Sequence, residues 1–222
     1  MSRPIVIAVD GTAASGKGTL ARRLAAHFHF AHLDSGSLYR LAALRILRAH
    51  GDLRDEAAAV ASARAVDPAD AERYDLRGRE IAEGASVVAA IPGVRAELLA
   101  WQQHFARDPG AAGAVIDGRD IGTVVCPDAT AKLFVDAAPE LRARRRRLEL
   151  EAAGEPASEA AILAEIRARD ARDRNRTVAP LLRAPDAALL DTSNLDIDAA
   201  FAAALALVRP RIEEALAARQ RG

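Results

Sequence analysis

The chain has 222 residues, of which half are hydrophobic, with 31 basic and 31 acidic side chains. Balanced charge gives no overall electrostatic basis for binding nucleic acid or an anionic membrane, and no apolar run approaches the roughly 18 residues that a membrane-spanning helix needs. A single cysteine, Cys126, excludes an intramolecular disulfide and suits a reducing compartment. We therefore expect one domain over residues 1–222, located in the cytoplasm, with neither nucleic acid nor membrane as its partner.

The first predicted elements are a strand, a glycine-rich turn and a helix. Residues 4–9, PIVIAV, form a continuous apolar run typical of a buried parallel strand, and a helical pattern follows the turn. A turn in this position binds phosphate through inward backbone N–H groups, glycines that let the chain curl, and one ammonium group. The sequence predicts a nucleotide phosphate loop formed by Gly11, Thr12, Ala13, Ala14, Ser15, Gly16, Lys17, Gly18 and Thr19.

This loop departs from the commonest phosphate-binding pattern in one position. GTP switches and motor ATPases place Ser or Thr directly after the lysine, to bind Mg²⁺. Here Gly18 takes that position and Thr19 comes one residue later, an ending that looks like the loop of nucleoside monophosphate kinases. A guanine-reading N-K-x-D motif is absent because neither lysine follows an asparagine. The sequence therefore disfavours a switch GTPase.

A second strand is predicted to end at Asp34, next to the phosphate loop. This carboxylate can organise Mg²⁺ through water, while the ATP oxygens hold most of the ion. Residues 36–108 follow without a clear strand pattern, and their middle part is polar. We expect an insertion over the sheet there.

Three further apolar runs, at 112–117, 131–137 and 186–192, predict the remaining strands of a parallel α/β sheet with crossover helices. Asp117 ends the first of these runs, and Arg119 and Asp120 come just after it. Ligands of open α/β sheets bind outside the carboxyl ends of the strands, so these side chains should face the same crevice as the phosphate loop.

Charged side chains dominate the segment before the last strand. Arg169, Asp173 and Arg176 have the spacing of one helical stripe, for which surface ion pairing is the simplest explanation. However, five arginines between 167 and 176 face only two acids, so part of this charge is available for phosphates. A second arginine cluster occupies 142–147, and Gly154 and Pro156 then predict a mobile flap at 151–160. A C-terminal helix should begin at Asp196 or Asp198 and be interrupted near Pro210.

Taken together, GKGT, LDSGSLYR, SVVAAIPGVR, DGRDIGTVV with PDA, and RDARDRNR with APL resemble the bacterial cytidylate kinases of the nucleoside monophosphate kinase family. The resemblance implies a P-loop kinase core of five parallel strands flanked by helices, with a shortened insertion at 36–108 that binds the monophosphate and a short lid at 151–165. It also implies a monomer that uses Mg²⁺ with ATP to phosphorylate CMP and dCMP.

The resemblance assigns roles to single residues. Ser35 and Arg40 match the acceptor site, and Ser86, Arg95 and Asp120 match the group that reads cytosine. An aspartate accepts a hydrogen bond from the amino group that cytosine has and uracil lacks. The remaining matches are to residues that contact the sugar and the phosphates: Arg119, Arg169, Asp173 and Arg176.

With Lys17, the arginines Arg119, Arg169 and Arg176 form the expected catalytic set, because they offset the charge of the transferred group. Cys126 stands where the family often has Phe, and we expect it to be buried and inert. Two alternatives stay open: a kinase for another monophosphate, UMP or AMP, which the shortened insertion permits, and a non-enzymatic nucleotide-sensing module.

Overall fold

The computed structural model describes residues 4–76, 78–152, 154–155 and 158–221. Within them one sheet has the strand order β2-β3-β1-β4-β5, and every neighbouring pair is parallel. The strands are β1 (Ile5–Gly11), β2 (Ala31–Asp34), β3 (Gly113–Gly118), β4 (Ala131–Asp136) and β5 (Ala188–Asp191). The prediction of a five-stranded parallel α/β sheet is confirmed.

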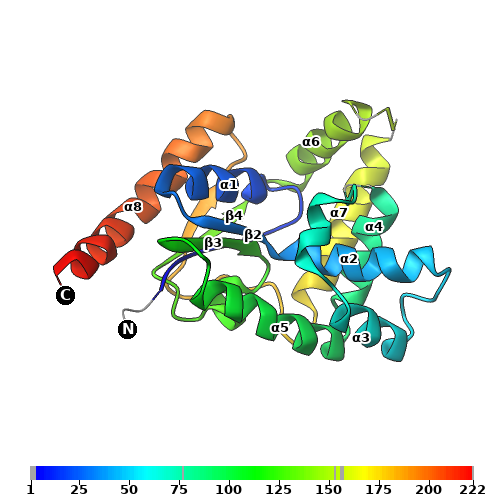
Figure 1. The fold of residues 1–222 in the computed structure, drawn as a ribbon. Helices are drawn as coiled ribbons and strands as arrows, with labels where there is room; N and C mark the ends of the chain where they lie inside the picture. The colour runs from blue at the N-terminus through cyan, green and yellow to red at the C-terminus, as the bar shows by residue number, and fades with distance from the viewer. Residues whose placement is uncertain (1–3, 77, 153, 156–157, 222) are drawn as a thin grey trace.

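Both faces of the sheet are covered by helices, which explains why the central strands β1 and β3 are buried along their whole length. Alternate residues of β1 point to opposite faces: Ile5, Ile7 and Val9 belong to one apolar cluster, and Val6 and Ala8 belong to another. Helices α1 (Lys17–Phe28) and α8 (Ile197–Arg221) pack on the first face, and α5 (Pro92–Arg107) packs on the second (Figure 1).

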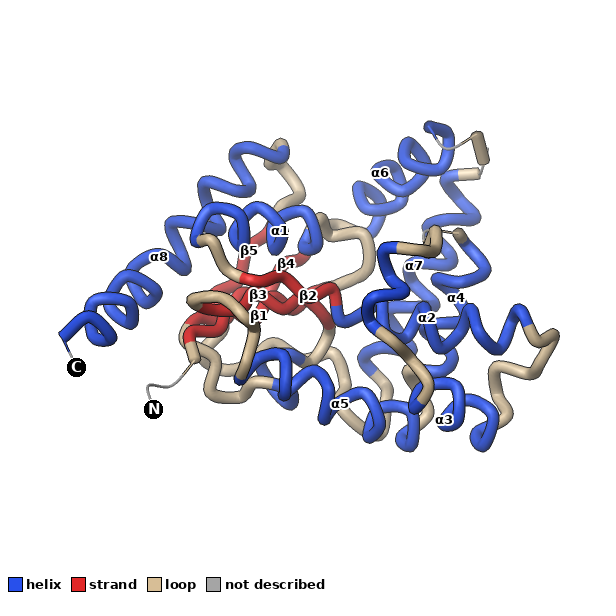
Figure 2. The backbone as a smooth tube through the Cα atoms, in the orientation of Figure 1, coloured by secondary structure: helices blue, strands red, loops and turns tan. Residues whose placement is uncertain are grey.

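The predicted insertion is helical in its described residues. It contains α2 (Ser35–Arg48), α3 (Glu56–Arg64), the short 3₁₀ helix η1 (Pro68–Glu72), α4 (Arg79–Val88) and α5. Helices α2 to α5 share an apolar core of their own, and Figure 2 shows α2, α3 and α4 beside the sheet, beyond the end of β2. No single helix of the described residues has the length and hydropathy of a membrane span, although α4 and α5, joined at a 99° bend, reach these values together.

Two antiparallel helices lie beside the phosphate loop: α6 (Pro139–Ala152) and α7 (Glu159–Arg174). They share a small apolar cluster, and Ala14 of the phosphate loop packs against it. The flap predicted at 151–160 covers the end of α6, the connection and the start of α7, and its residues 153, 156 and 157 lie outside the described part of the chain.

The prediction of an interruption near Pro210 is wrong, because α8 continues from Ile197 to Arg221 with the proline inside it. A proline removes one N–H and leaves the carbonyl four residues earlier without its helical donor. Ala206 and Pro210 are both exposed, so water can reach that carbonyl. The helix begins after Asp196, whose carboxylate accepts from the Ala199 N–H at 2.8 Å.

Candidate active site

The phosphate loop connects β1 to α1 and requires glycine at two of its positions. Gly11 has φ 156°, and a Cβ there would lie 2.0 Å from the Val135 carbonyl oxygen of β4. Gly16 has φ 86° and precedes the first residue of α1, Lys17. The N-terminal N–H groups of α1 therefore open toward the loop, which is the arrangement that binds phosphate.

Side-chain hydroxyls fix the backbone of this loop from within the fold. Thr12 donates to Asp136 at 2.7 Å, and Ser15 donates to the Thr12 carbonyl at 3.0 Å. These two hydroxyls bind other groups of the protein and so hold the conformation of the loop. The contribution to ATP binding predicted for Thr12 and Ser15 therefore comes from their backbone N–H groups.

A pocket lies next to the loop, at the carboxyl ends of β2 and β3. Every residue predicted for the acceptor site and for catalysis lines it, together with Asp34, Tyr39 and Asp117. The predicted residues come from α1, α2, α4, α5, the segment after β3, and the end of α7 with the residues that follow it: Lys17, Ser35, Arg40, Ser86, Arg95, Arg119, Asp120, Arg169, Asp173 and Arg176. Side chains spread over 160 positions of sequence thus meet in one pocket.

The turn after β3 is held by a residue that the sequence analysis did not select. Asp10, at the end of β1, accepts from the N–H groups of Ile121 and Gly122, both at 2.7 Å. It thereby caps the short helix η2 (Ile121–Val125) and fixes the two preceding residues, Arg119 and Asp120. Burial raises the pKa of Asp10 to about 7. Its position directly before Gly11 was the only signal in the sequence.

The end of the pocket formed by α4 and α5 carries the residues matched to cytosine reading. Asp120 and Arg95 form a buried ion pair, and the Arg95 guanidinium lies 5.6 Å from the centre of the Tyr39 ring. The Ser86 hydroxyl is buried and has no hydrogen-bond partner among the described residues. A buried donor without a protein partner needs one from water or a ligand, because leaving it unpaired costs about 1–3 kcal/mol.

Asp173 arranges the arginines at the centre of the pocket. It accepts from Arg119 Nε at 2.8 Å and also binds the Arg176 guanidinium. Burial acts to raise its pKa, but Arg119, Arg176 and Arg169 together hold it below the usual range. The Nε atoms of Arg169 and Arg176 are buried without a partner in the described part of the protein. Asp173 is therefore an anionic bridge that fixes two guanidiniums before any substrate binds.

The carboxylates of the pocket do not neutralise all of its basic side chains. Lys17 opens to the pocket but is otherwise surrounded by protein, and this burial, followed by the charge of Arg119, lowers its pKa to about 8. Burial and then Arg119 lower the pKa of Arg169 to about 10. Both groups would regain their ordinary pKa beside bound phosphates, because an anion favours the charged form.

One part of the arginine prediction is wrong. Arg176 does not lie on the helical stripe, because α7 ends at Arg174; it reaches Asp173 from the following turn. The arginines of 167–176 do not all converge on the pocket. Arg167 pairs with Glu140, and Arg172 pairs with Glu83.

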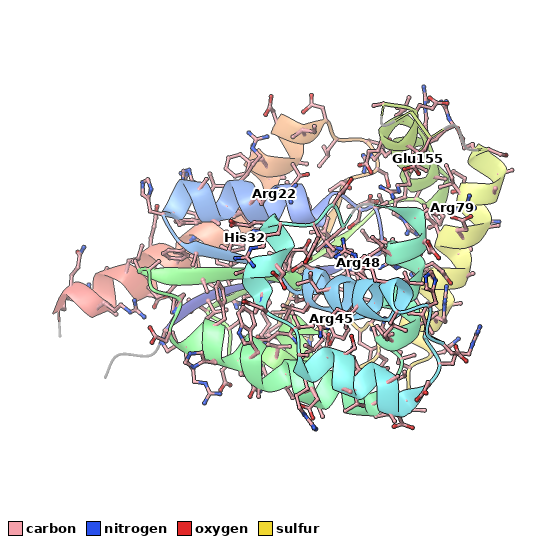
Figure 3. The ribbon with its side chains drawn as sticks, turned by 45° about the vertical axis from the view of Figure 1, so that its right-hand side comes forward. Arg22, His32, Arg45, Arg48, Arg79 and Glu155 are labelled. Atoms are coloured by element: carbon pink, nitrogen blue, oxygen red, sulfur yellow. The ribbon has the colours of Figure 1, made fainter. Side chains whose placement is uncertain are left out.

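Arg172 instead contributes to a link between the insertion and α7. Its pair with Glu83 has a neighbour, Arg79 with Glu165, and both pairs join α4 to α7. Figure 3 shows Arg79 beside α7. Both pairs are at least partly exposed, so each contributes little to stability.

One carboxylate of the pocket, that of Asp34, suits the binding of a magnesium ion. No group of three or more His, Cys, Asp or Glu side chains able to hold a metal occurs in the residues that the structure covers. Asp34 lines the pocket and accepts from Arg40 at 2.5 Å. Burial acts to raise its pKa, but Arg40 and Lys17 outweigh this and keep it below its usual range, so the carboxylate is charged. This site fits an ion held mainly by ATP oxygens, with Asp34 acting through water.

The sequence of this chain is similar to those of one known family. The family model for cytidylate kinase matches residues 7–210. A cytidylate kinase of Xanthobacter autotrophicus is 59% identical over 207 residues, which cover 93% of this chain and 98% of the relative. A cytidylate kinase of Nitrobacter winogradskyi is 56% identical over 204 residues, covering 92% of this chain and 95% of the relative.

Two solved structures resemble this chain in fold alone. An uncharacterised protein of Eubacterium ventriosum has a TM-score of 0.55 at 14% identity and covers 92% of this chain and 98% of its own. A protein of Chloroflexus aurantiacus has a TM-score of 0.51 at 16% identity, over 97% of this chain and 99% of its own. The sequence matches, which span nearly the whole chain, decide the relationship: the chain belongs to the cytidylate kinase family.

Proposed function

We propose that this protein transfers the γ-phosphoryl group of ATP to CMP and dCMP, forming CDP and dCDP. The observation that carries the proposal is the convergence of Lys17, Arg119, Arg169 and Arg176 on one pocket whose far end holds Asp120 and Arg95. ATP occupies the phosphate loop, and the monophosphate occupies the pocket with its base toward α4 and α5. The family model and the relatives named above support CMP as acceptor and lend no support to UMP, AMP or a sensing role.

The reaction needs no general base from the protein. The acceptor phosphate oxygen is already anionic and attacks the γ-phosphorus in line, so the protein contributes alignment and charge stabilisation. Lys17 and the three arginines offset charge on the transferred group, and Asp173 keeps two of these arginines in place. Mg²⁺ bound with ATP would add positive charge at the phosphates, and Asp34 would hold it through water.

The remaining expectations belong to the same proposal. Residues 36–108 bind the monophosphate, since Ser86 and Arg95 come from them, and 151–165 act as a lid that excludes water. The protein works in the cytoplasm, in line with its single cysteine, and as a monomer, which the resemblance to cytidylate kinases implies.

The test is an ADP-release assay with CMP, dCMP, UMP, AMP and GMP as acceptors. We expect turnover with CMP and dCMP, and its loss in Lys17→Met with the fold intact by circular dichroism. Asp120→Ala should reduce kcat/KM for CMP far more than for UMP. Arg174→Met, which removes an exposed guanidinium at the end of α7, is the matched control and should retain activity. Equal losses of kcat/KM with CMP and UMP would show that Asp120 does not read the base. Absence of turnover with every acceptor would contradict the proposal.

A further inference from the structure

One arginine of the 142–147 cluster lies behind the phosphate loop, outside the pocket. The Arg142 side chain is 1% exposed. Its Nε donates to the Ala137 carbonyl at 2.9 Å, Nη1 donates to the Ala13 carbonyl at 2.9 Å, and Nη2 donates to Asp170 at 2.6 Å. One guanidinium thus connects the residue after β4, the phosphate loop and α7.

The bond to Ala13 sets the direction of a phosphate-loop amide. In a planar trans peptide unit the C=O and the following N–H point in opposite directions. Because Arg142 binds the Ala13 carbonyl from the α6 side, the Ala14 N–H must point away from α6. Ala14 is a non-glycine residue with φ 57°, a conformation that the chain adopts only when its surroundings impose it.

A second carbonyl of the loop is bound in the same way. Thr192 donates to the Ser15 carbonyl at 3.0 Å, which sets the direction of the Gly16 N–H. Arg145 in turn donates to the Thr192 hydroxyl at 3.2 Å and to its carbonyl at 2.7 Å. Helix α6 therefore fixes the loop at two carbonyls, directly through Arg142 and indirectly through Arg145.

Stability alone does not account for the Arg142–Asp170 pair. Desolvation of a buried ion pair offsets most of its attraction, and apolar residues of similar size are often as stable. Asp170 uses only one carboxylate oxygen, since Oδ1 is buried with no hydrogen-bond partner in the described residues. What the pair does provide is geometry, because the planar guanidinium fork fixes its three acceptors relative to one another. Asp170 also directly follows Arg169, which lines the pocket.

We propose that Arg142 is a positioning residue for ATP: through the Ala13 carbonyl it orients the phosphate-loop amides, and through Asp170 it ties that loop to the helix carrying Arg169. This role rests on the proposed function only in taking the loop as the ATP site. It acts without contact between Arg142 and either substrate.

The test separates geometry from stability with three variants. Arg142→Met removes the bond to Ala13 and leaves Asp170 as an unpaired buried charge, so it should be strongly destabilised in urea. Arg142→Met/Asp170→Ala removes that charge as well and should recover much of the urea midpoint. Arg142→Lys keeps a cation beside Asp170 but lacks the fork. All three lack the three-way guanidinium geometry, so each should lose about tenfold or more in kcat/KM for ATP, the equivalent of one charge-assisted hydrogen bond.

Two measurements make the result specific. ATP affinity is measured by calorimetry without acceptor, and KM is measured for both substrates; we expect the KM for ATP to rise more than the KM for CMP. The control is Arg167→Met, which cuts the exposed Arg167–Glu140 pair between the same two helices and should change neither substrate's kinetics. If the wild type did not phosphorylate CMP, the proposed function would be contradicted. Calorimetry of ATP binding without acceptor would still test the role of Arg142 at the phosphate loop.

The proposal is overturned if ATP affinity recovers together with the urea midpoint in the double variant, because the role is then structural. It is equally overturned if Arg142→Lys binds and uses ATP normally. The Lys variant decides the matter should the Met variants fail to fold.

Discussion

The buried carboxyl of Asp10 predicts an unusual dependence of stability on pH. Burial raises its pKa from 3.8 to about 7 in the folded protein, whereas in the unfolded chain the group keeps its ordinary value. Between these two values the folded state binds one proton more than the unfolded state, so stability falls as pH rises. At about 1.4 kcal/mol per pKa unit, the whole contribution is about 4 kcal/mol, complete below pH 4 and lost above about pH 7.

Asp10→Asn isolates this contribution, because the amide does not titrate. Asparagine keeps an acceptor for one of the N–H groups of Ile121 and Gly122 but presents a donor to the other, a cost of about 1–3 kcal/mol that is independent of pH. The wild type should therefore exceed Asp10→Asn in stability most at pH 5. This difference should shrink by about 3 kcal/mol by pH 8.

The assay is urea unfolding of both proteins at half-unit steps from pH 5 to pH 8, without nucleotide. Taking the difference between the two curves cancels the titration of the other carboxylates. Arg174→Met serves as a control for a surface change and should run parallel to the wild type. If the curves of wild type and Asp10→Asn also run parallel, Asp10 is charged in the folded state throughout, and our account of its burial is refuted.

Two further predictions concern titratable groups. The Lys17 pKa of about 8 implies that ATP affinity, measured by calorimetry, weakens above pH 8 by up to about tenfold per pH unit, since the free protein then loses the ammonium; Lys17→Arg should abolish this dependence, and an identical slope in both proteins would contradict it. Burial raises the pKa of Cys126 to about 11, so at pH 7.5 iodoacetamide should label the folded protein about a hundredfold more slowly than the urea-unfolded one, and comparable rates would show an accessible thiolate.

Local pattern was sufficient to predict much of this structure. The predicted strands at 4–9, 112–117, 131–137 and 186–192 lie within two residues of β1, β3, β4 and β5 at each end. Buried parallel strands are continuous apolar runs, and that signal lies within each segment. The phosphate loop is equally local, because its glycines and Lys17 fall within eight residues.

What the sequence did not reveal depends on contacts between distant segments. Asp10 binds N–H groups 111 and 112 residues away, and Arg142 binds a carbonyl 129 residues away. No periodicity encodes such partners. The arginine cluster at 142–147 illustrates the difficulty: the sequence shows only that positive charge is concentrated there, whereas Arg142 is buried against backbone carbonyls.

The network around Asp173 explains how a protein without a general base can still be an efficient phosphotransferase. Free guanidiniums in one pocket repel one another, and long side chains would have to be ordered when substrate binds, which costs free energy at that step. Asp173 removes this cost by fixing Arg119 and Arg176 in advance, and only part of each guanidinium is used in doing so. Two other carboxylates of the pocket are already paired, Asp120 with Arg95 and Asp34 with Arg40. The charge left over in the centre is cationic and preorganised, and it suits the negative charge on the phosphoryl group that passes between two nucleotides.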